Sequence, residues 1–388
     1  MRTTVRDSVP GEQVDAIDFT RTGPGTLAGR YLRCYWQPAF RALDIAPGRS
    51  KPARVMSEDL TVYRGESGEP HVVAFRCAHR GTQLSTGWVE GDDLRCFYHG
   101  WKYNSAGQCI EQPAEPEPFC DRIKIRSYPT REYLGLVFAY LGDGEPPVFP
   151  RYSAYEGDGI VEVGPCAAAP VNFFNRIDNG PDTAHLKFVH SPFLDRMGIP
   201  SVESVETEFG VKTSTRFPNG WLNETFLIMP NVTLFPGRPR AAGDDVSTDQ
   251  LAWVVPVDDE HYRFVQVSVT KGSDGPSGRF ENLTPTAPEI GATVTAGYAR
   301  VKDFLQRPDI FEIQDCVSQA GQGTFAPRDQ EHLGRSDAGV VLLRKIWERE
   351  LQRLATGKPL TEWRVPDGLV ANMGRQRTAE DLQSAVPG

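Results

Sequence analysis

The sequence predicts an α+β fold in two parts: a small all-β domain, then a larger domain in which helices cover an antiparallel sheet. The chain has 388 residues, and a single hydrophobic core rarely serves so long a chain. Short apolar runs bounded by turn residues fill its first third, whereas longer strand patterns are mixed with helical patterns afterwards. Glycine and proline residues gather between the two regions.

The boundary between the domains is expected at 142–147, because its glycines and prolines break both helices and strands. We therefore divide the chain into an N-terminal segment (1–30), a first domain (31–145) and a second domain (146–388). Strands of the first domain are predicted at 60–63, 72–75, 94–97 and 134–141. Long antiparallel strands of the second domain are predicted at 220–235, 251–257 and 261–270.

Helices are predicted at 182–190 and 336–356. The longer one is expected to begin with Ser336 as its N-cap and to stop at Gly357. Its apolar residues recur at helical spacing, which predicts packing in the core; they are Leu343, Trp347, Leu351 and Leu354.

The composition limits the classes of partner. A net charge of −9 argues against a nucleic-acid backbone as ligand. Residues 1–16 have no apolar run typical of a signal peptide, and no later stretch is long enough to span a bilayer, so we expect a cytoplasmic protein without a membrane partner. The seven cysteines do not suggest a disulfide framework. Five of them are expected to be buried hydrophobic residues: Cys34, Cys109, Cys120, Cys166 and Cys316.

Two short motifs in the first domain combine cysteine with histidine. Cys77 and His79 form a C-x-H pattern, and Cys96 and His99 form a C-x-x-H pattern. Two thiolates and two imidazoles can hold either a tetrahedral zinc ion or a [2Fe–2S] cluster in which histidines replace two cysteines. Paired zinc ligands usually have at least two residues between them, so the single residue between Cys77 and His79 favours the cluster. A glycine follows each motif and lets its loop approach a compact cluster closely.

A second group of ligand-type residues opens the second domain. Pro181 favours the first turn of a helix, which would place Asp182 and His185 on one face. His190 lies five residues further on, so a bent or widened turn is needed if both imidazoles meet one ion. Two histidines and a carboxylate leave open positions on a non-haem Fe(II) ion. The three other histidines are expected to have no metal role: His71, His261 and His332.

These motifs resemble those of the Rieske non-haem iron oxygenases that hydroxylate aromatic rings. C-A-H-R-G and C-x-Y-H-G-W are similar to their Rieske motif, and D-x-x-H-x-x-x-x-H is similar to their iron motif. The resemblance covers nearly the whole chain, and its catalytic region looks closest to the phthalate and carbazole dioxygenase branch. It implies a Rieske domain followed by a catalytic domain of the helix-grip (START-like) type.

The resemblance also implies roles for individual residues. Both cysteines would bind one iron of the cluster and both histidines the other, which raises the reduction potential. His185 and His190 would bind the mononuclear iron, with Asp182 as a catalytic residue beside them. The third iron ligand would be an acidic residue late in the chain, for which we choose Asp315. The alternatives are Asp303, Asp309 and Glu312.

The implied function is that of a terminal oxygenase component, which uses O2 and electrons from NAD(P)H that a reductase delivers, either directly or through a ferredoxin. Electrons would cross between the subunits of a homotrimer, from His99 of one chain to Asp182 of its neighbour. The expected reaction is dihydroxylation of an aromatic substrate, either an aromatic acid or a biaryl compound. The alternative is monooxygenation, such as O- or N-demethylation.

Residues next to the iron motif are candidates for the substrate pocket. These are Asn179, Thr183 and Leu186, with Phe226 and Met229 as weaker candidates. Asp178, four residues before Asp182, stands where many relatives have asparagine.

Two other classes of function are compatible with parts of the sequence. One is a simple Rieske electron carrier, which would not need the second histidine motif, and the other is a zinc-stabilised binding module. Metal analysis separates them, because about three irons per chain indicate the oxygenase, two the carrier, and zinc the module.

Overall fold

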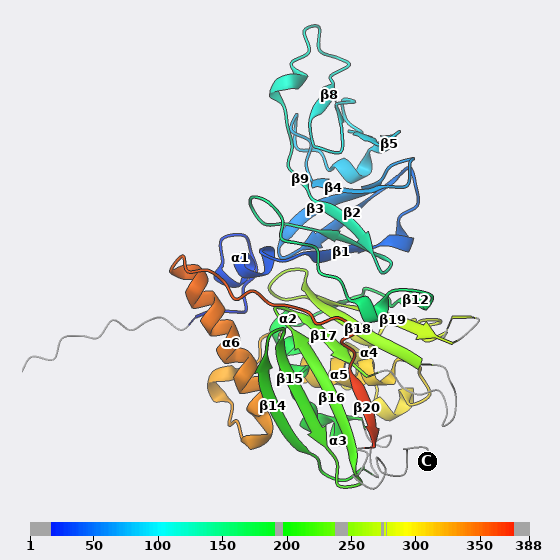
Figure 1. The fold of residues 1–388 in the computed structure, drawn as a ribbon. Coiled ribbons are helices and arrows are strands. Elements are labelled where there is room, and N and C mark those ends of the chain that lie inside the picture. The colour runs from blue at the N-terminus through cyan, green and yellow to red at the C-terminus, as the bar shows by residue number, and fades with distance from the viewer. Residues whose placement is uncertain (1–16, 191–196, 237–246, 273–274, 277, 376–388) are drawn as a thin grey trace, which may run out of the picture.

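The first third of the chain folds into three small antiparallel sheets at one end of the molecule (Figure 1). The structure is a computed structural model that describes residues 17–190, 197–236, 247–272, 275–276 and 278–375. The first sheet contains β1 (Gln37–Arg41), β11 (Leu136–Ala139) and β10 (Thr130–Tyr133). The second contains β2 (Arg49–Val55), β3 (Glu58–Arg64), β4 (Pro70–Ala74) and β9 (Ser127–Tyr128). The third contains β5 (Trp88–Glu90), β6 (Asp93–Arg95), β7 (Lys102–Tyr103) and β8 (Cys109–Glu111).

The four strands predicted in this region are confirmed as β3, β4, β6 and β11. The strand predicted at 94–97 ends at Arg95, so Cys96 begins the loop that follows.

A large antiparallel sheet forms the second part of the chain. Within the described residues it has nine strands. In spatial order its main path contains β12 (Ile160–Val163), β19 (Tyr262–Lys271), β18 (Ser247–Pro256), β17 (Val232–Phe235), β16 (Trp221–Ile228), β15 (Gly210–Arg216) and β14 (Ser201–Thr207). Two short strands pair outside this path: β13 (Ala168–Ala169) with β19, and β20 (Asn372–Arg375) with β16.

The strand predicted at 220–235 is wrong as a single element, because the structure divides it into β16 and β17. Pro230 lies between them and has no N–H group to continue a ladder. Asn231 fixes the turn, since its side-chain Nδ2 donates to the Val254 carbonyl at 2.8 Å and to Gln37 Oε1 at 2.9 Å. The strands predicted at 251–257 and 261–270 are confirmed as β18 and β19.

Helices lie against this sheet (Figure 1). The α-helices are α1 (Leu27–Arg33), α2 (Phe173–Asn179), α3 (Leu186–Val189), α4 (Ala287–Thr295), α5 (Ile310–Gly321) and α6 (Ala338–Ala355). The apolar stripe of α6 is core, as predicted: Leu343, Trp347 and Leu351 are each 0% exposed. Gly357 follows the helix with φ +66°, as expected for its stop.

Two helix predictions need correction. Ser336 is not the N-cap of α6, because it lies inside the 3₁₀ helix η9 (Arg335–Asp337) and Asp337 occupies the cap position. The helix predicted at 182–190 is not regular. It consists of the 3₁₀ helix η5 (Thr183–His185) followed by the single turn α3, so the bend comes from a tightened turn, not a widened one.

One hydrophobic core crosses the junction between the two parts. It includes Leu60 and Val137 from the small sheets together with Trp253 and Trp347 from the second part. The β2–β3 turn adds two backbone hydrogen bonds, from the N–H of Met56 to the Pro256 carbonyl at 2.8 Å and from Ser57 to Val257 at 2.8 Å. The two parts are therefore joined by a continuous buried core and by backbone hydrogen bonds.

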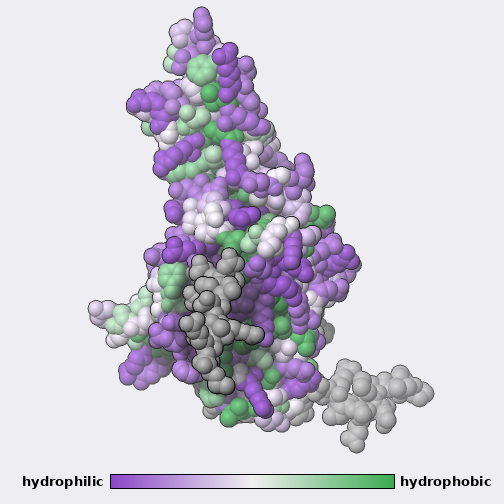
Figure 2. All heavy atoms as spheres, turned by 90° about the vertical axis from the view of Figure 1, so that its left-hand side faces the viewer, coloured by the Kyte–Doolittle hydropathy of each residue, from purple (hydrophilic) through white to green (hydrophobic). Residues whose placement is uncertain are grey.

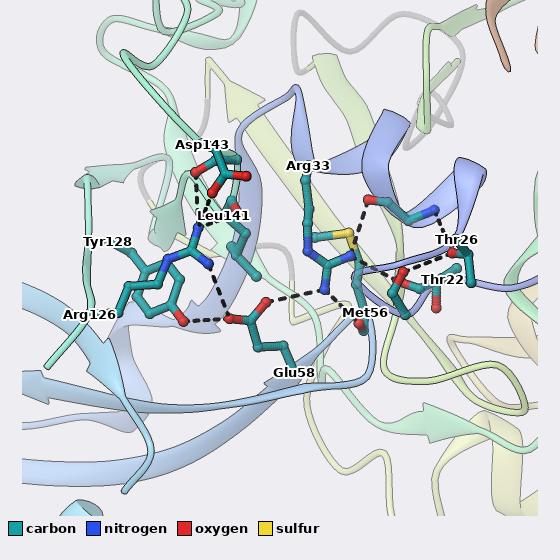
Figure 3. Close-up of polar contacts among 12 residues, drawn as sticks. Thr22, Thr26, Arg33, Met56, Glu58, Arg126, Tyr128, Leu141 and Asp143 are labelled. Carbon is teal, nitrogen blue, oxygen red and sulfur yellow. Dashed lines mark hydrogen bonds and ion pairs between the residues drawn. The ribbon is translucent and has the colours of Figure 1, made fainter. Parts of the chain in front are cut away.

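A polar network ties the N-terminal helix to the same junction (Figure 3). Glu58 of β3 accepts hydrogen bonds from Arg33 of α1 and from the hydroxyl of Tyr128. Arg33 also donates to the Met56 carbonyl at 2.8 Å, and Arg126 donates to the Leu141 carbonyl at 2.9 Å. These bonds offset part of the cost of desolvating the buried Arg33 guanidinium.

The face drawn in Figure 2 is mostly hydrophilic, with small hydrophobic patches scattered over both parts of the chain. None of the described helices combines the length and the apolar composition needed to cross a bilayer. Of the five cysteines expected to be buried, Cys109 and Cys316 are. The other three, at helix ends or in a loop, are only partly buried: Cys34, Cys120 and Cys166.

Candidate metal centres

Two loops with matching backbones carry the cysteine–histidine motifs. The Cys77 carbonyl accepts a hydrogen bond from the N–H of Gly81 at 2.9 Å, and the Cys96 carbonyl accepts one from Gly100 at 3.1 Å. Gly81 has φ +76° and Gly100 has φ +73°, in the left-handed region that favours glycine. The two glycines thus close two tight loops that face each other at the end of the molecule bearing β5 and β8.

The two sulfur atoms are shielded and held by hydrogen bonds. Cys77 is 4% exposed and Cys96 is 2% exposed. Burial, together with the neighbouring Cys77, raises the pKa of the Cys96 thiol. The hydroxyl of Tyr103 lies 3.2 Å from Cys77 Sγ and accepts the N–H of Ala78 at 3.2 Å. When Cys77 is deprotonated to bind a metal, its sulfur can only accept a hydrogen bond, so the Tyr103 hydroxyl is then the donor.

The two imidazoles lie next to each other. The ring centroids of His79 and His99 are 4.5 Å apart, and Trp101 stacks on His79 at 4.5 Å with an interplanar angle of 6°. Nδ1 of His79 is buried without a hydrogen-bond partner in the described structure, so this atom is free to bind a metal. Phe97 and Tyr98, between Cys96 and His99, are 65% and 55% exposed.

The ligand arrangement in these loops fits a binuclear cluster better than zinc. Each loop supplies one buried cysteine and one histidine, and the two imidazoles lie next to each other. Two thiolates on one iron and two imidazoles on the other are the ligands of a [2Fe–2S] cluster in which histidines replace two cysteines.

A second group of ligand atoms meets between helices of the second part. His185 ends η5, His190 follows α3 and Asp315 lies in α5. Their ligand atoms all lie within 4.8 Å of one another. Asp315 Oδ1 is 3.6 Å from Nε2 of each histidine and, although buried, has no hydrogen-bond partner in the described structure. Two imidazoles and an orphaned carboxylate oxygen fit a facial Fe(II) site.

Neighbouring groups orient both imidazoles. His190 Nδ1 lies 2.9 Å from Gln314 Oε1, which makes Nδ1 the donor and leaves Nε2 for a metal. His185 Nδ1 contacts the backbone carbonyl of Asp182, and the Asp182 carboxylate lies 3.8 Å away. Burial lowers the pKa of His190, which favours the neutral imidazole that metals bind.

Asp315 is held in its charged form. Burial alone would raise its pKa, but Arg176 and the two histidines outweigh this effect and keep the pKa below its ordinary value. The other acidic candidates for this position do not join the ligand group in the described structure. Asp309 bonds to Arg307 at 2.8 Å, and Asp303 lies in a separate 3₁₀ turn, η7 (Val301–Phe304).

A cavity of about 640 Å³ opens beside the three ligands. The predicted pocket residues Asn179, Thr183 and Leu186 all line it. The hydroxyl of Thr183 is already bonded to that of Thr215. The two weaker candidates, Phe226 and Met229, do not line the cavity and pack in the main core.

The cavity wall includes residues that the sequence did not single out. Its aromatic members are Trp221, Phe235, Phe264 and Phe311. The sheet contributes a polar floor made of Asn223, Thr225, Thr233, Gln250 and Gln266. Alternation along β16 puts Asn223 and Thr225 on one face, a signal present in the sequence but shared by many strands.

Charged side chains also line the cavity. Arg176 and Arg279 contribute guanidinium groups, and Glu312 lies near both. Burial raises the pKa of Glu312 to about 7, although Arg176 opposes this shift. Each charge thus has a nearby opposite charge, as buried charges require.

Asp178 is not part of the cavity wall. Its carboxylate accepts hydrogen bonds from Arg344 at 2.7 Å and from Arg328 at 3.2 Å, and Arg344 also bonds to Glu331. Asp178 therefore joins α2 to α6 and to the segment before α6, one turn away from Asp182.

The fold and the two groups of ligands define a class of protein that combines an iron–sulfur cluster with a mononuclear iron. The family profile described as "Rieske [2Fe-2S] domain" matches residues 35–129. Phenoxybenzoate dioxygenase subunit alpha of Ectopseudomonas oleovorans is 32% identical over 376 residues, which cover 90% of this chain and 86% of that protein. The 5,5'-dehydrodivanillate O-demethylase oxygenase subunit of Sphingobium sp. (strain NBRC 103272 / SYK-6) is 28% identical over 371 residues, which cover 89% and 81%.

A solved structure shares the fold. The match to the reduced complex between oxygenase and ferredoxin in carbazole 1,9a-dioxygenase has a TM-score of 0.59 and 21% identity, over 84% of this chain and 93% of that chain. This chain belongs to the Rieske non-haem iron oxygenases, as an oxygenase (alpha) subunit. It is an enzyme that contains a [2Fe–2S] cluster and a mononuclear iron and uses O2.

Proposed function

We propose that this enzyme dihydroxylates the ring of an aromatic acid in the cavity beside His185, His190 and Asp315. These three residues would bind the mononuclear iron, and Cys77, His79, Cys96 and His99 would bind the cluster. The cluster supplies electrons, and the mononuclear iron supplies the reaction with O2. We propose that the domain at 31–145 binds the cluster and that the domain at 146–388 binds the mononuclear iron, after the N-terminal segment 1–30.

The charge and shape of the cavity carry this proposal. Two arginines and two carboxylates, Asp315 and Glu312, lie around it. A bound Fe(II) ion would leave the site with an excess of positive charge, which favours an anionic substrate. The aromatic wall suits a planar ring, and a carboxylate can bind a guanidinium through two hydrogen bonds. Both arginines have acidic neighbours, and we assign Arg279 to the substrate because a substrate carboxylate at Arg176 would compete with Asp315, to which Arg176 donates at 2.8 Å.

The placement of the two proposed metal sites toward opposite ends of the molecule supports electron transfer between subunits. Figure 1 places α3 at one end of the molecule and strands β5 and β8 at the other end. We infer a homotrimer in which His99 of one chain donates its free ring N–H to Asp182 of the neighbouring chain, which holds His185. A ferredoxin or reductase would deliver electrons from NAD(P)H. The neighbour of the same fold that was solved in complex with ferredoxin supports such a partner.

O-demethylation of a methoxylated aromatic acid is the second candidate. The polar floor formed by Asn223, Gln250 and Gln266 favours it, since a phenol or an ether oxygen can bond to these amides. The likeness to an O-demethylase oxygenase subunit gives further support. In this reaction a methyl carbon, instead of a ring carbon, would face the iron.

Product analysis separates the two reactions. The purified protein, its surrogate reductase, NADH and O2 would be incubated with benzoates, phenoxybenzoates and methoxybenzoates. A diol product supports dihydroxylation, whereas formaldehyde with a free phenol supports demethylation. Turnover of neutral biaryls alone would contradict the preference for acids, and Arg279→Met should raise KM for acids far more than kcat is lowered.

The proposed bridge between subunits is tested at Asp182. Asp182→Ala should retain about three irons per chain yet lose most turnover, because the route between the metals is interrupted. Asp337→Ala is the matched control, since Asp337 is a nearby carboxylate that acts on the pKa of Asp182. Wild-type turnover in Asp182→Ala would refute the bridge, and a monomer in solution would refute the trimer.

A further inference from the structure

Arg176 links the proposed iron site to the cavity wall. It lies in α2, is 8% exposed, and its Nη1 donates to Asp315 Oδ2 at 2.8 Å and to Asn179 Oδ1 at 2.9 Å. Its Nη2 is 3.5 Å from Glu312 Oε2, and its guanidinium carbon lies 3.9 Å from the ring centroid of Phe264. Contacts on several sides hold the guanidinium, so it has little freedom to turn away from Asp315.

The two oxygens of Asp315 have different surroundings. Oδ2 accepts the hydrogen bond from Arg176. Oδ1 has no hydrogen-bond partner in the described structure and lies 3.6 Å from Nε2 of both His185 and His190. A charge-assisted bond to a buried arginine is among the stronger hydrogen bonds of a protein interior. Only Oδ1 is therefore presented to the point where the two imidazoles converge.

We propose that Arg176 is a positioning residue that restricts Asp315 to binding the metal through Oδ1 alone. This inference rests on the proposed role of Asp315 as the third iron ligand. Two imidazoles and one carboxylate oxygen would occupy one position fewer on a bound Fe(II) ion than two imidazoles and both oxygens. By holding Oδ2, Arg176 would leave that position open to O2.

The contacts of Asp315 make the alternative binding mode costly. Binding through both oxygens would require Oδ2 to leave Arg176, whose guanidinium is buried and would lose a charged acceptor. Glu312 would be its remaining charged partner, at a distance of 3.5 Å.

Cobalt substitution tests the number of donor atoms directly. Metal-free mononuclear sites would be loaded with Co(II) in protein that retains its cluster, and the cobalt absorption would be compared between wild type, Arg176→Met and Arg176→Lys. We expect weaker absorption in Arg176→Met, as the second oxygen of Asp315 joins the metal, together with a loss of turnover of about 10-fold or more. The cobalt absorption of Arg176→Lys should lie between that of wild type and that of Arg176→Met, because lysine retains the positive charge but not the planar guanidinium.

Controls separate this inference from the rest. Arg279→Met removes another arginine of the cavity wall and should keep the wild-type cobalt spectrum. The double variant Arg176→Met/Glu312→Gln removes one charge of each sign and so leaves no unpaired Glu312 charge. If Arg176→Met alone does not fold, the cobalt spectrum of this double variant tests the role of Arg176. An unchanged cobalt spectrum in the Arg176 variants would overturn the inference, as would a Co(II)-bound crystal structure with both Asp315 oxygens on the metal. Unaltered Co(II) affinity in Asp315→Ala would instead refute the proposed ligand itself.

Discussion

Removing the hydroxyl of Tyr103 should lower the reduction potential of the cluster. The Tyr103 side chain is 0% exposed, and its hydroxyl lies 3.2 Å from Cys77 Sγ. The reduced cluster carries one more negative charge than the oxidised cluster, so its sulfurs accept a stronger hydrogen bond. Tyr103→Phe therefore destabilises the reduced form more than the oxidised form, and the midpoint potential falls.

The size of the shift follows from the strength of one hydrogen bond to a charged group, about 1.5 kcal/mol. For a one-electron couple a tenfold change in the equilibrium constant corresponds to about 1.4 kcal/mol and about 59 mV. The full loss of the bond would thus lower the potential by up to about 60 mV.

A redox titration followed by circular dichroism or by the electron paramagnetic resonance of the reduced cluster measures this shift. Tyr98→Phe is the matched control, because the Tyr98 ring lies against His99, with centroids 3.8 Å apart, and is largely exposed. A Tyr103→Phe protein with an intact cluster and an unchanged or higher potential would show that the hydroxyl does not act on the sulfur.

Two other substitutions test the second part of the chain. Gln314→Ala removes the acceptor of the His190 Nδ1–H and should weaken Co(II) binding at the mononuclear site about 10–100-fold in a titration. Gln319→Ala, on the same helix, should leave the Co(II) affinity unchanged. Equal losses of affinity in the two variants would argue against the orienting bond. Asp178→Ala leaves two partly buried arginines without their shared carboxylate and should lower the free energy of unfolding by about 3 kcal/mol in urea. An unchanged unfolding midpoint would contradict this.

Local patterns predicted the metal motifs and several strands. The spacing of Cys77 and His79, and of His185 and His190, is visible in the sequence because each motif lies on one loop or turn. The apolar stripe of α6 was predicted for the same reason, since helical periodicity is local. Asp315 depended on resemblance to a family, because its helix joins the histidines only in the folded chain.

Contacts between distant residues could not be predicted. Arg176 and Asp315 are 139 residues apart in the sequence, and Tyr103 is 26 residues from Cys77. Nothing in the local pattern around Arg176 distinguishes it from a surface arginine. The hairpin at Pro230 was missed for another reason: apolar residues continue on both sides of the turn, so periodicity alone did not separate the two strands.

The shared core at the junction has a consequence for electron transfer. An electron-carrying domain on a flexible linker reaches its acceptor by moving as a whole. The rate of electron transfer then depends on the linker and on solvent viscosity. In this chain, tryptophans and aliphatic residues of both parts pack in one buried core. The backbone N–H groups of Met56 and Ser57 also donate hydrogen bonds to carbonyls of the second part. An electron carrier held by the two cysteine–histidine loops would therefore keep one orientation relative to the second part of the chain, which is set when the chain folds.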